Sequence, residues 1–295
     1  MFKGMSIKEF NRAFQNEGDC HQYLFDLKWV NGFCCRRCGC TQSYKGKTRF
    51  YMRCRACRYD ESVTAHTMFH KLKIPLIKAF GMAFRLSVKK KGMSTTELAK
   101  EFSINQKSSW LFKRKTQEAM KSSGKYLLDS KVEVDEIFIG GPEKNRRGRN
   151  KGSKKLVVIA VEKVQGDKLG RAYAEVIEHA SGDCFKPFFD RHIDRDNAQV
   201  ITDGWPGYLP LENEFDIRQK PSNGGKAFPG LHVVIMNLKG WIRGIHHHCS
   251  ERFTNGYLDE FFFRFNRRNH LNSIWHKLIE RFMVMPPYIY KAVAT

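Results

Sequence analysis

The chain contains no stretch that approaches the roughly 18 consecutive apolar residues of a membrane-spanning helix. Its opening residues, Met1 to Met5, also lack the charged and apolar regions of a signal peptide. These two absences predict a protein that has no membrane partner and stays in the cytoplasm. Disulfides are not expected in that compartment, so the nine cysteines are interpreted as metal ligands or as isolated buried thiols.

Acidic residues are scarce, because 30 Asp and Glu stand against 52 Lys and Arg and leave a net charge of +22. Residues 1–130 hold 26 of the basic residues and 10 of the acidic ones, a net charge of +16, and the remainder carries +6. Neutralising phosphates releases counterions and gives sequence-independent affinity for nucleic acid. We therefore expect the first half to be the principal DNA-binding half, with a merely solvated basic surface as the alternative.

Two aspartates lie in or directly after short β-branched runs. Asp135 stands within residues 132–139, which have the composition of a mostly buried strand, and Asp203 follows Ile201 and Thr202. A buried carboxylate costs several kcal/mol unless something positive binds it. In a chain this basic, the pattern predicts a divalent-metal site that faces a polyanion.

Four cysteines have the spacing of a zinc ribbon. They are Cys35, Cys38, Cys54 and Cys57. Each CxxC turn offers two thiolates to a tetrahedral structural Zn²⁺, and the intervening fifteen residues have the length of a hairpin with a turn at 45–47. Cys34 and Cys40 crowd the first pair, so a shifted choice of ligands is the alternative.

The helical patterns after the ribbon resemble a helix-turn-helix. Residues 76–88 have helical apolar spacing, Ser94 and Glu97 form a capping box, and Asn105 is placed to cap a further helix that carries Lys113 and Arg114. The last helix would enter the major groove, and these two cations are candidate DNA contacts. The alternative is a plain helical linker.

The second half has the order of elements of an RNase H-like α/β fold. Strands are expected at 131–139, 154–164 and 170–177, followed by a helix at 183–192 and a strand at 198–202. Parallel pairing of the first and last of these strands would bring Asp135 and Asp203 together. The expected domains are an N-terminal helical segment at 1–30, a zinc ribbon at 31–70, a helix-turn-helix-like region at 71–125 and a catalytic domain at 126–295.

Two further segments are rich in cations. Residues 144–155 include Arg146, Arg147 and Arg149, which either lie in an exposed loop or clamp the DNA backbone beside Asp135. A helical projection of residues 232–250 aligns one polar stripe, which consists of His232, Lys239, Arg243, His246 and Ser250. We expect this stripe to face DNA, and we interpret 246–248 as interface or phosphate contacts more readily than as a metal cluster.

Several of these motifs together resemble the zinc-ribbon transposases of bacterial insertion sequences, the ISXO-like group. They are the four cysteines, Val132-Glu-Val-Asp-Glu-Ile-Phe-Ile-Gly-Gly141, Val200-Ile-Thr-Asp-Gly-Trp-Pro-Gly-Tyr208, Trp241-Ile-Arg-Gly244 and the segment 257–268. The resemblance covers nearly the whole chain. It implies an RNase H-like DDE catalytic core, phosphoryl transfer with two Mg²⁺ or Mn²⁺ ions, and action on terminal inverted repeats, with Asp135 and Asp203 as the first two acids.

The third catalytic position departs from the group's pattern. Members have Glu or Asn there, seven residues before a lysine on the same helix, and here that spacing gives His232 and Lys239. The chain is similar to a known subgroup with histidine. Imidazole suits Mn²⁺ better than Mg²⁺, so His232 either completes the metal site or holds a metal-bound water or a phosphate oxygen. Glu251 and Glu260 are reserve candidates for a carboxylate.

The sequence therefore predicts a bacterial, nucleoid-associated transposase that binds double-stranded DNA at transposon ends and target and acts as a homo-oligomer on DNA. A DNA-binding regulator that has lost cleavage and a stand-alone nuclease are the alternatives.

Overall fold

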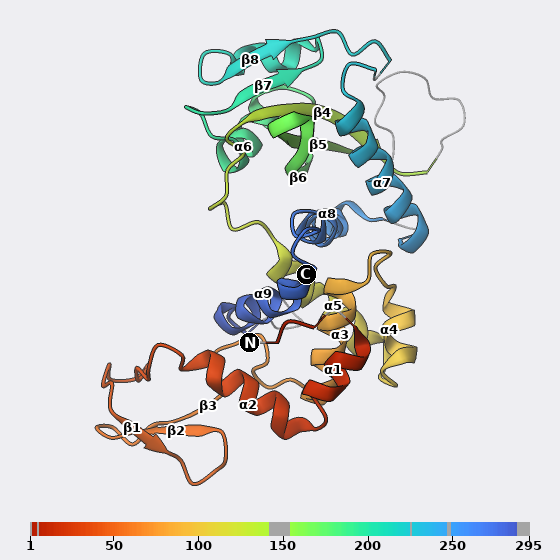
Figure 1. The fold of residues 1–295 in the computed structure, drawn as a ribbon. Coiled ribbons are helices and arrows are strands. Elements are labelled where there is room, and N and C mark those ends of the chain that lie inside the picture. The colour runs from red at the N-terminus through yellow and green to blue at the C-terminus, as the bar shows by residue number, and fades with distance from the viewer. Residues whose placement is uncertain (1, 5, 142–153, 225, 247–248, 288–295) are drawn as a thin grey trace. The chain divides into compact units, whose positions relative to one another are not determined.

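The computed structural model describes residues 2–4, 6–141, 154–224, 226–246 and 249–287. It forms two compact units (Figure 1), the first made of residues 1–119 and 270–295 and the second of residues 120–269.

Two short helices and a three-stranded sheet begin the first unit. The elements are α1 (Ile7–Ala13), α2 (Glu17–Lys28), β1 (Ser43–Lys45), β2 (Tyr51–Cys54) and β3 (Asp60–Ser62). Capping boxes start both helices, and the antiparallel strand order is β1-β2-β3. Lys28 at the end of α2 pairs with the buried Glu61 of β3 at 2.7 Å, which fastens the helix to the sheet.

Four helices complete the first unit. They are α3 (Leu76–Val88), α4 (Thr95–Glu101), α5 (Gln106–Met120) and α9 (Leu271–Val284). Glu17 of α2 accepts hydrogen bonds from the backbone N–H groups of Leu76 and Ile77 at 3.1 and 2.9 Å, so it caps α3, whose N-cap residue is proline. The expected capping box of Ser94 and Glu97 starts α4.

Helix α9 packs in the first unit, although the sequence interpretation included its residues in a catalytic domain that ran to 295. Trp275 of α9 is buried against Phe80 of α3, with ring centroids 5.3 Å apart, and its indole N–H donates to the Phe80 carbonyl at 3.3 Å. Phe282 contacts Phe69 and Phe112 through edge-on rings. Apolar packing over a long sequence separation therefore decides the place of this helix.

The second unit is built on a five-stranded mixed sheet. Its strands are β4 (Lys131–Ile139), β5 (Lys155–Val164), β6 (Lys168–Ile177), β7 (Gln199–Thr202) and β8 (Asp216–Gln219), in the order β6-β5-β4-β7-β8. Strands β4, β5 and β6 are antiparallel, whereas β4, β7 and β8 are parallel. The expected order of strands is thus observed, and the fold is the RNase H-like α/β fold.

Helices cover both faces of this sheet (Figure 1). The remaining elements are η1 (Gln165–Asp167), α6 (Gly182–His192), η2 (Pro206–Leu211), α7 (Pro229–Ile245) and α8 (Glu251–Phe265). One core contains Phe185 and Phe189 of α6, and the other contains Leu231 of α7 and Leu258 of α8. Strand β5 is buried on both faces, which explains its unbroken apolar run.

Helix α8 closes the outer edge of β6. The side-chain oxygen of Asn255 accepts from the Val176 N–H at 2.8 Å, and the Asn266 amide bonds both the N–H and the carbonyl of Ala172, at 2.8 and 2.9 Å. These side chains take the place of a neighbouring strand, because an edge strand presents backbone groups that otherwise pair with another chain.

The single helix expected over 232–250 is wrong in its extent. Helix α7 begins at Pro229 and ends at Ile245, and Ser250 is the residue directly before the next helix, α8. The imidazole of His246 stacks on the ring of Tyr257 with centroids 3.7 Å apart. His246 and Ser250 therefore do not extend the polar stripe that His232, Lys239 and Arg243 form on α7.

Candidate metal and DNA-binding sites

Asp135, in the middle of β4, and Asp203, directly after β7, come together where the parallel pairing of these two strands ends. The pairing of β4 with β7 runs from Lys131 opposite Gln199 to Glu133 opposite Ile201. Asp135 stands two residues beyond the last of these pairs on β4, and Asp203 directly follows β7. Side-chain oxygens of Asp135, Glu136 and Asp203 all lie within 4.8 Å of one another. The expected meeting of the two aspartates is therefore observed, with an additional glutamate.

Local hydrogen bonds hold both aspartates. The Oδ1 atom of Asp135 accepts from the Glu136 N–H at 2.8 Å, and that of Asp203 accepts from the Trp205 N–H at 3.1 Å. The Trp205 indole N–H donates to the Ala180 carbonyl at 2.8 Å, which anchors the turn after β7. A Cβ atom on Gly207 would lie 2.5 Å from the same carbonyl oxygen, so this turn requires glycine there.

Glu136 was not among the candidate residues from the sequence. It points to the opposite face of the sheet from Asp135, because side chains alternate along a strand. The hydroxyl of Tyr208, in η2, donates to its Oε2 atom at 2.8 Å. Burial, followed by the negative charge of Glu136, raises the pKa of Tyr208, so this hydroxyl stays protonated and remains a donor. Only the adjacency of Glu136 to Asp135 in the sequence hinted at its place.

Helix α7 supplies a cation to the same region. Lys239 is half-buried, and this burial lowers the pKa of its ammonium group, while the Asp135 carboxylate acts in the opposite direction. Arg243 is exposed one turn later. His232 is half-buried seven residues before Lys239, about 10 Å along the helix axis. Its ring nitrogens are not part of the close group formed by the three carboxylates.

The oxygen-rich group fits a divalent cation of the Mg²⁺ or Mn²⁺ kind, because carboxylates are the preferred ligands of these ions. The reserve residues do not belong to it. Glu260 is fully buried and pairs with Arg264 at 2.8 Å, and Glu251 lies exposed in the first turn of α8.

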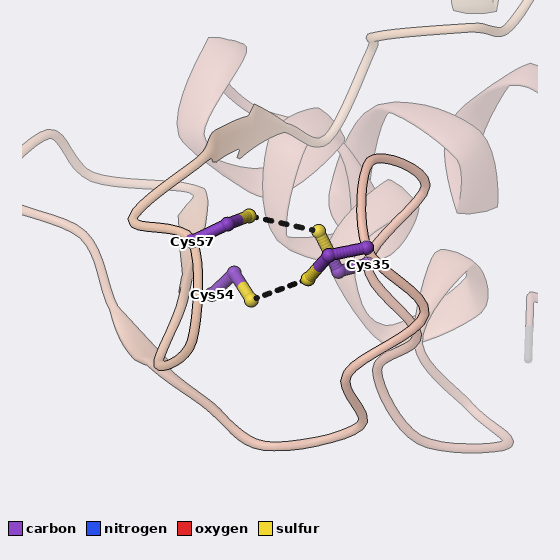
Figure 2. A group of neighbouring side chains, drawn as sticks. Cys35, Cys54 and Cys57 are labelled. Atoms are coloured by element: carbon purple, nitrogen blue, oxygen red, sulfur yellow. Dashed lines mark hydrogen bonds between the residues drawn. The ribbon is translucent and has the colours of Figure 1, made fainter.

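The four cysteines of the ribbon form the second candidate metal site. The sulfur of Cys35 lies 3.6 Å from that of Cys57, and the sulfur of Cys38 lies 3.5 Å from that of Cys54. Figure 2 shows sulfurs of the two CxxC turns directed toward each other. Zn–S bonds of about 2.3 Å in a tetrahedron require sulfurs roughly 3.8 Å apart, so the donors fit Zn²⁺. Cys34 and Cys40 are outside this group of four.

The thiol of Cys54 lies in the interior of the ribbon. Its side chain is fully buried, and hydrogen bonds, first of all from the Cys57 backbone N–H, lower the pKa of Cys54. A thiolate is the form that binds metal.

The expected DNA contacts differ in their surroundings. Lys113 is only 1% exposed and donates to the Met93 carbonyl at 2.6 Å, so this ammonium group is not at the surface of α5, contrary to its expected role. Arg114 is half-buried and donates to Gln117 at 2.9 Å. Exposed residues on α5 include Gln106 and Lys107 in its first turn. Arg146, Arg147 and Arg149 lie outside the described residues.

None of the described helices is both long and apolar enough to cross a membrane. A search of curated protein sequences finds no match. Among solved structures, the chain is similar to a pre-cleavage Mos1 transpososome, with 11% identity, a TM-score of 0.31 and coverage of 71% of this chain and 79% of the other. A Mos1 transposase paired-end complex with left transposon end gives 14% identity, a TM-score of 0.32 and coverage of 69% and 78%. These scores are too low to carry the assignment.

Two family models match the chain and do carry it. The ISXO2-like transposase domain matches residues 127–266, which include β4 to β8 and both aspartates, and the transposase zinc-ribbon domain matches residues 15–60, which include the four cysteines. Together they cover more than half of the chain. The chain therefore belongs to the zinc-ribbon DDE transposases of insertion sequences and is a DNA transposase.

Proposed function

We propose that this transposase binds the terminal inverted repeats of an insertion sequence and catalyses metal-dependent DNA cleavage and strand transfer at Asp135 and Asp203. The observation that carries the proposal is the meeting of these two carboxylates with Glu136 within 4.8 Å, in a chain with a net charge of +22. Such a concentration of negative charge in a basic protein is costly unless cations bind it.

Asp135 and Asp203 would hold the divalent ions. When bound, a pair of Mg²⁺ or Mn²⁺ ions would supply the activation of water, and then of a 3′-hydroxyl, for in-line attack on a phosphodiester. Lys239 holds a phosphate oxygen and offsets the charge that accumulates in the transition state. Its half-buried position beside Asp135 supports this role, because a cation acts more strongly where water is reduced. Arg243, exposed one turn later, binds the DNA backbone.

His232 is proposed to contact a phosphate oxygen or a metal-bound water. It shares helix α7 with Lys239, and it is separate from the close group of carboxylates. Direct ligation of the metal by His232 is the alternative that the sequence left open. A metal-binding measurement on the His232 variant would reveal it.

The first unit is proposed to recognise and hold the transposon ends. Cys35, Cys38, Cys54 and Cys57 would bind one structural Zn²⁺, and α4 and α5 would act as a helix-turn-helix with α5 in the major groove. The Ser109 hydroxyl donates to the Thr95 carbonyl at 2.9 Å, which supports a fixed angle between these helices. Arg114, Arg146, Arg147 and Arg149 are the proposed phosphate contacts, and the protein is proposed to act as a homo-oligomer on DNA.

A strand-transfer assay tests the proposal. Candidate ends found beside the gene serve as substrates, in Mg²⁺ and in Mn²⁺, and the variants are Asp135→Asn and Asp203→Asn. Each variant removes charge without changing shape. Loss of about 4 kcal/mol of charge stabilisation corresponds to roughly a 10³-fold slower reaction.

Binding of the same ends in a gel-shift assay should stay near the wild-type level, because the first unit holds the DNA. Full strand transfer by either variant would defeat the site assignment. Cleavage without joining by the wild type would instead indicate a stand-alone nuclease.

A further inference from the structure

The segment from Asp203 to Tyr208 contributes two residues to the acidic group formed by Asp135, Glu136 and Asp203. Its beginning contributes Asp203, whose carboxylate accepts from the Trp205 N–H at 3.1 Å. Its end contributes Tyr208, whose hydroxyl donates to Oε2 of Glu136 at 2.8 Å. One short turn after β7 therefore holds an acidic side chain of its own and one that belongs to β4.

Tyr208 is held rigidly. Its side chain is completely buried, and its ring stacks on Phe185 of α6 with centroids 4.4 Å apart and planes 8° from parallel. The preceding Gly207 lies so close to the Ala180 carbonyl that a Cβ atom would be 2.5 Å from the oxygen. A hydroxyl on such a ring has one position, so the carboxylate that accepts from it is held in one place as well.

Glu136 needs a holding interaction of this kind. Strand alternation directs its side chain to the opposite face from Asp135, and yet its carboxylate lies within 4.8 Å of those of Asp135 and Asp203. Like charges repel at this distance, so a hydrogen bond donated to the Glu136 carboxylate helps to keep it there. The Tyr208 hydrogen bond opposes that repulsion. It uses one of about four acceptor positions of a carboxylate, so it is compatible with metal ligation by the same group.

We infer that Glu136 is a third carboxylate ligand of the catalytic metal site and that Tyr208 is the residue that positions it. The inference rests on the proposed metal-dependent function. Helix α7 supplies His232 and Lys239 to this site but contains no acidic residue, so a third carboxylate must come from another element. Three carboxylates balance most of the charge of two divalent ions, whereas two aspartates balance half of it.

Mn²⁺ binding to the full-length, zinc-loaded protein without DNA tests the inference. Free Mn²⁺ is measured by its electron paramagnetic resonance signal during titration. Groups that orient a metal ligand typically contribute about 10- to 100-fold in affinity, so Tyr208→Phe should weaken binding by that factor. Glu136→Gln should weaken it at least as much.

A matched control is Tyr173→Phe, which removes a tyrosine hydroxyl that donates at 2.8 Å to the Tyr126 carbonyl, away from the acidic group. This variant should bind Mn²⁺ like the wild type. Glu136→Asp keeps the charge and shortens the reach to Tyr208, so its affinity should fall between those of the wild type and Glu136→Gln. If Tyr208→Phe lowers the melting temperature, its weaker binding could come from lost stability. The ligand assignment then depends on Glu136→Asp and Glu136→Gln.

Wild-type Mn²⁺ affinity in Glu136→Gln would overturn the ligand assignment. Wild-type affinity in Tyr208→Phe, with weakened binding in Glu136→Gln, would overturn the positioning role. Asp135→Asn tests the proposed function separately. If this variant also keeps wild-type Mn²⁺ affinity, the proposed metal site itself is wrong. If it loses affinity while Glu136→Gln does not, only the assignment of Glu136 is wrong.

Discussion

Replacing Cys54 by serine should release zinc and unfold the ribbon while the second unit stays folded. Within residues 33–59 of the ribbon, only Phe33, Cys35 and Cys54 are buried, and two of these three are metal ligands. Burying Phe33 contributes about 2 kcal/mol. Structural zinc contributes roughly 10–16 kcal/mol in ribbons and fingers of this size. The metal is therefore the main source of stability in this segment.

The expected loss follows from the number of ligands. Dividing the zinc contribution equally among four thiolates gives about 3 kcal/mol for each, which corresponds to more than a 100-fold loss of affinity. Serine does not replace the thiolate, because its hydroxyl remains protonated near neutral pH. Cys54 also lies at the end of β2, where its N–H donates to the Tyr59 carbonyl at 3.0 Å, so the change acts on the sheet directly.

Zinc content and trypsin sensitivity measure both effects. Wild-type protein purified without chelator should contain one zinc per chain and resist cleavage at the ribbon arginines. Cys54→Ser should lose the zinc and be cut there first, leaving the RNase H-like unit intact. The matched control is Cys184→Ser, which changes a half-buried cysteine of α6 and should behave as the wild type. Wild-type protein without zinc, or Cys54→Ser with tightly held zinc and an intact ribbon, would refute the reasoning.

Two further predictions concern histidines. His232→Ala should slow strand transfer by on the order of 10²-fold in Mg²⁺ and in Mn²⁺, because it removes a contact made in the transition state. The control is His179→Ala, which changes an exposed histidine and should keep the wild-type rate. Equal rates for the two variants would show that His232 is not part of the site. The Nδ1 atom of His276 lies 2.5 Å from the Tyr23 hydroxyl, and burial lowers the pKa of this histidine. The unfolded chain therefore binds more protons than the folded chain. As a result, the free energy of unfolding falls as pH drops through the ordinary histidine pKa. Thermal melts from pH 8 to pH 5 should show this fall, and His276→Gln should reduce it; a melting temperature that rises on acidification would contradict it.

Local patterns in the sequence determined much of this protein. The bounds of β4 followed from a β-branched run, and α4 from the capping box of Ser94 and Glu97. The ribbon followed from the CxxC spacing, because two thiolates in one turn form half of a tetrahedral site before any tertiary contact exists. Asp135 and Asp203 were predictable as partners because parallel pairing of their strands brings the end of β7 beside the middle of β4.

The tertiary structure alone decided where several side chains act. Glu136 lies on the opposite face of β4 from Asp135, and it joins the acidic group where Tyr208, 72 residues later, donates to it. Lys113 was expected at the DNA surface, but its ammonium group is buried and donates a hydrogen bond to the Met93 carbonyl. Helix α7 ends at Ile245, and the next residue, His246, stacks on Tyr257. Each of these depends on contacts between distant residues, which spacing and composition do not encode.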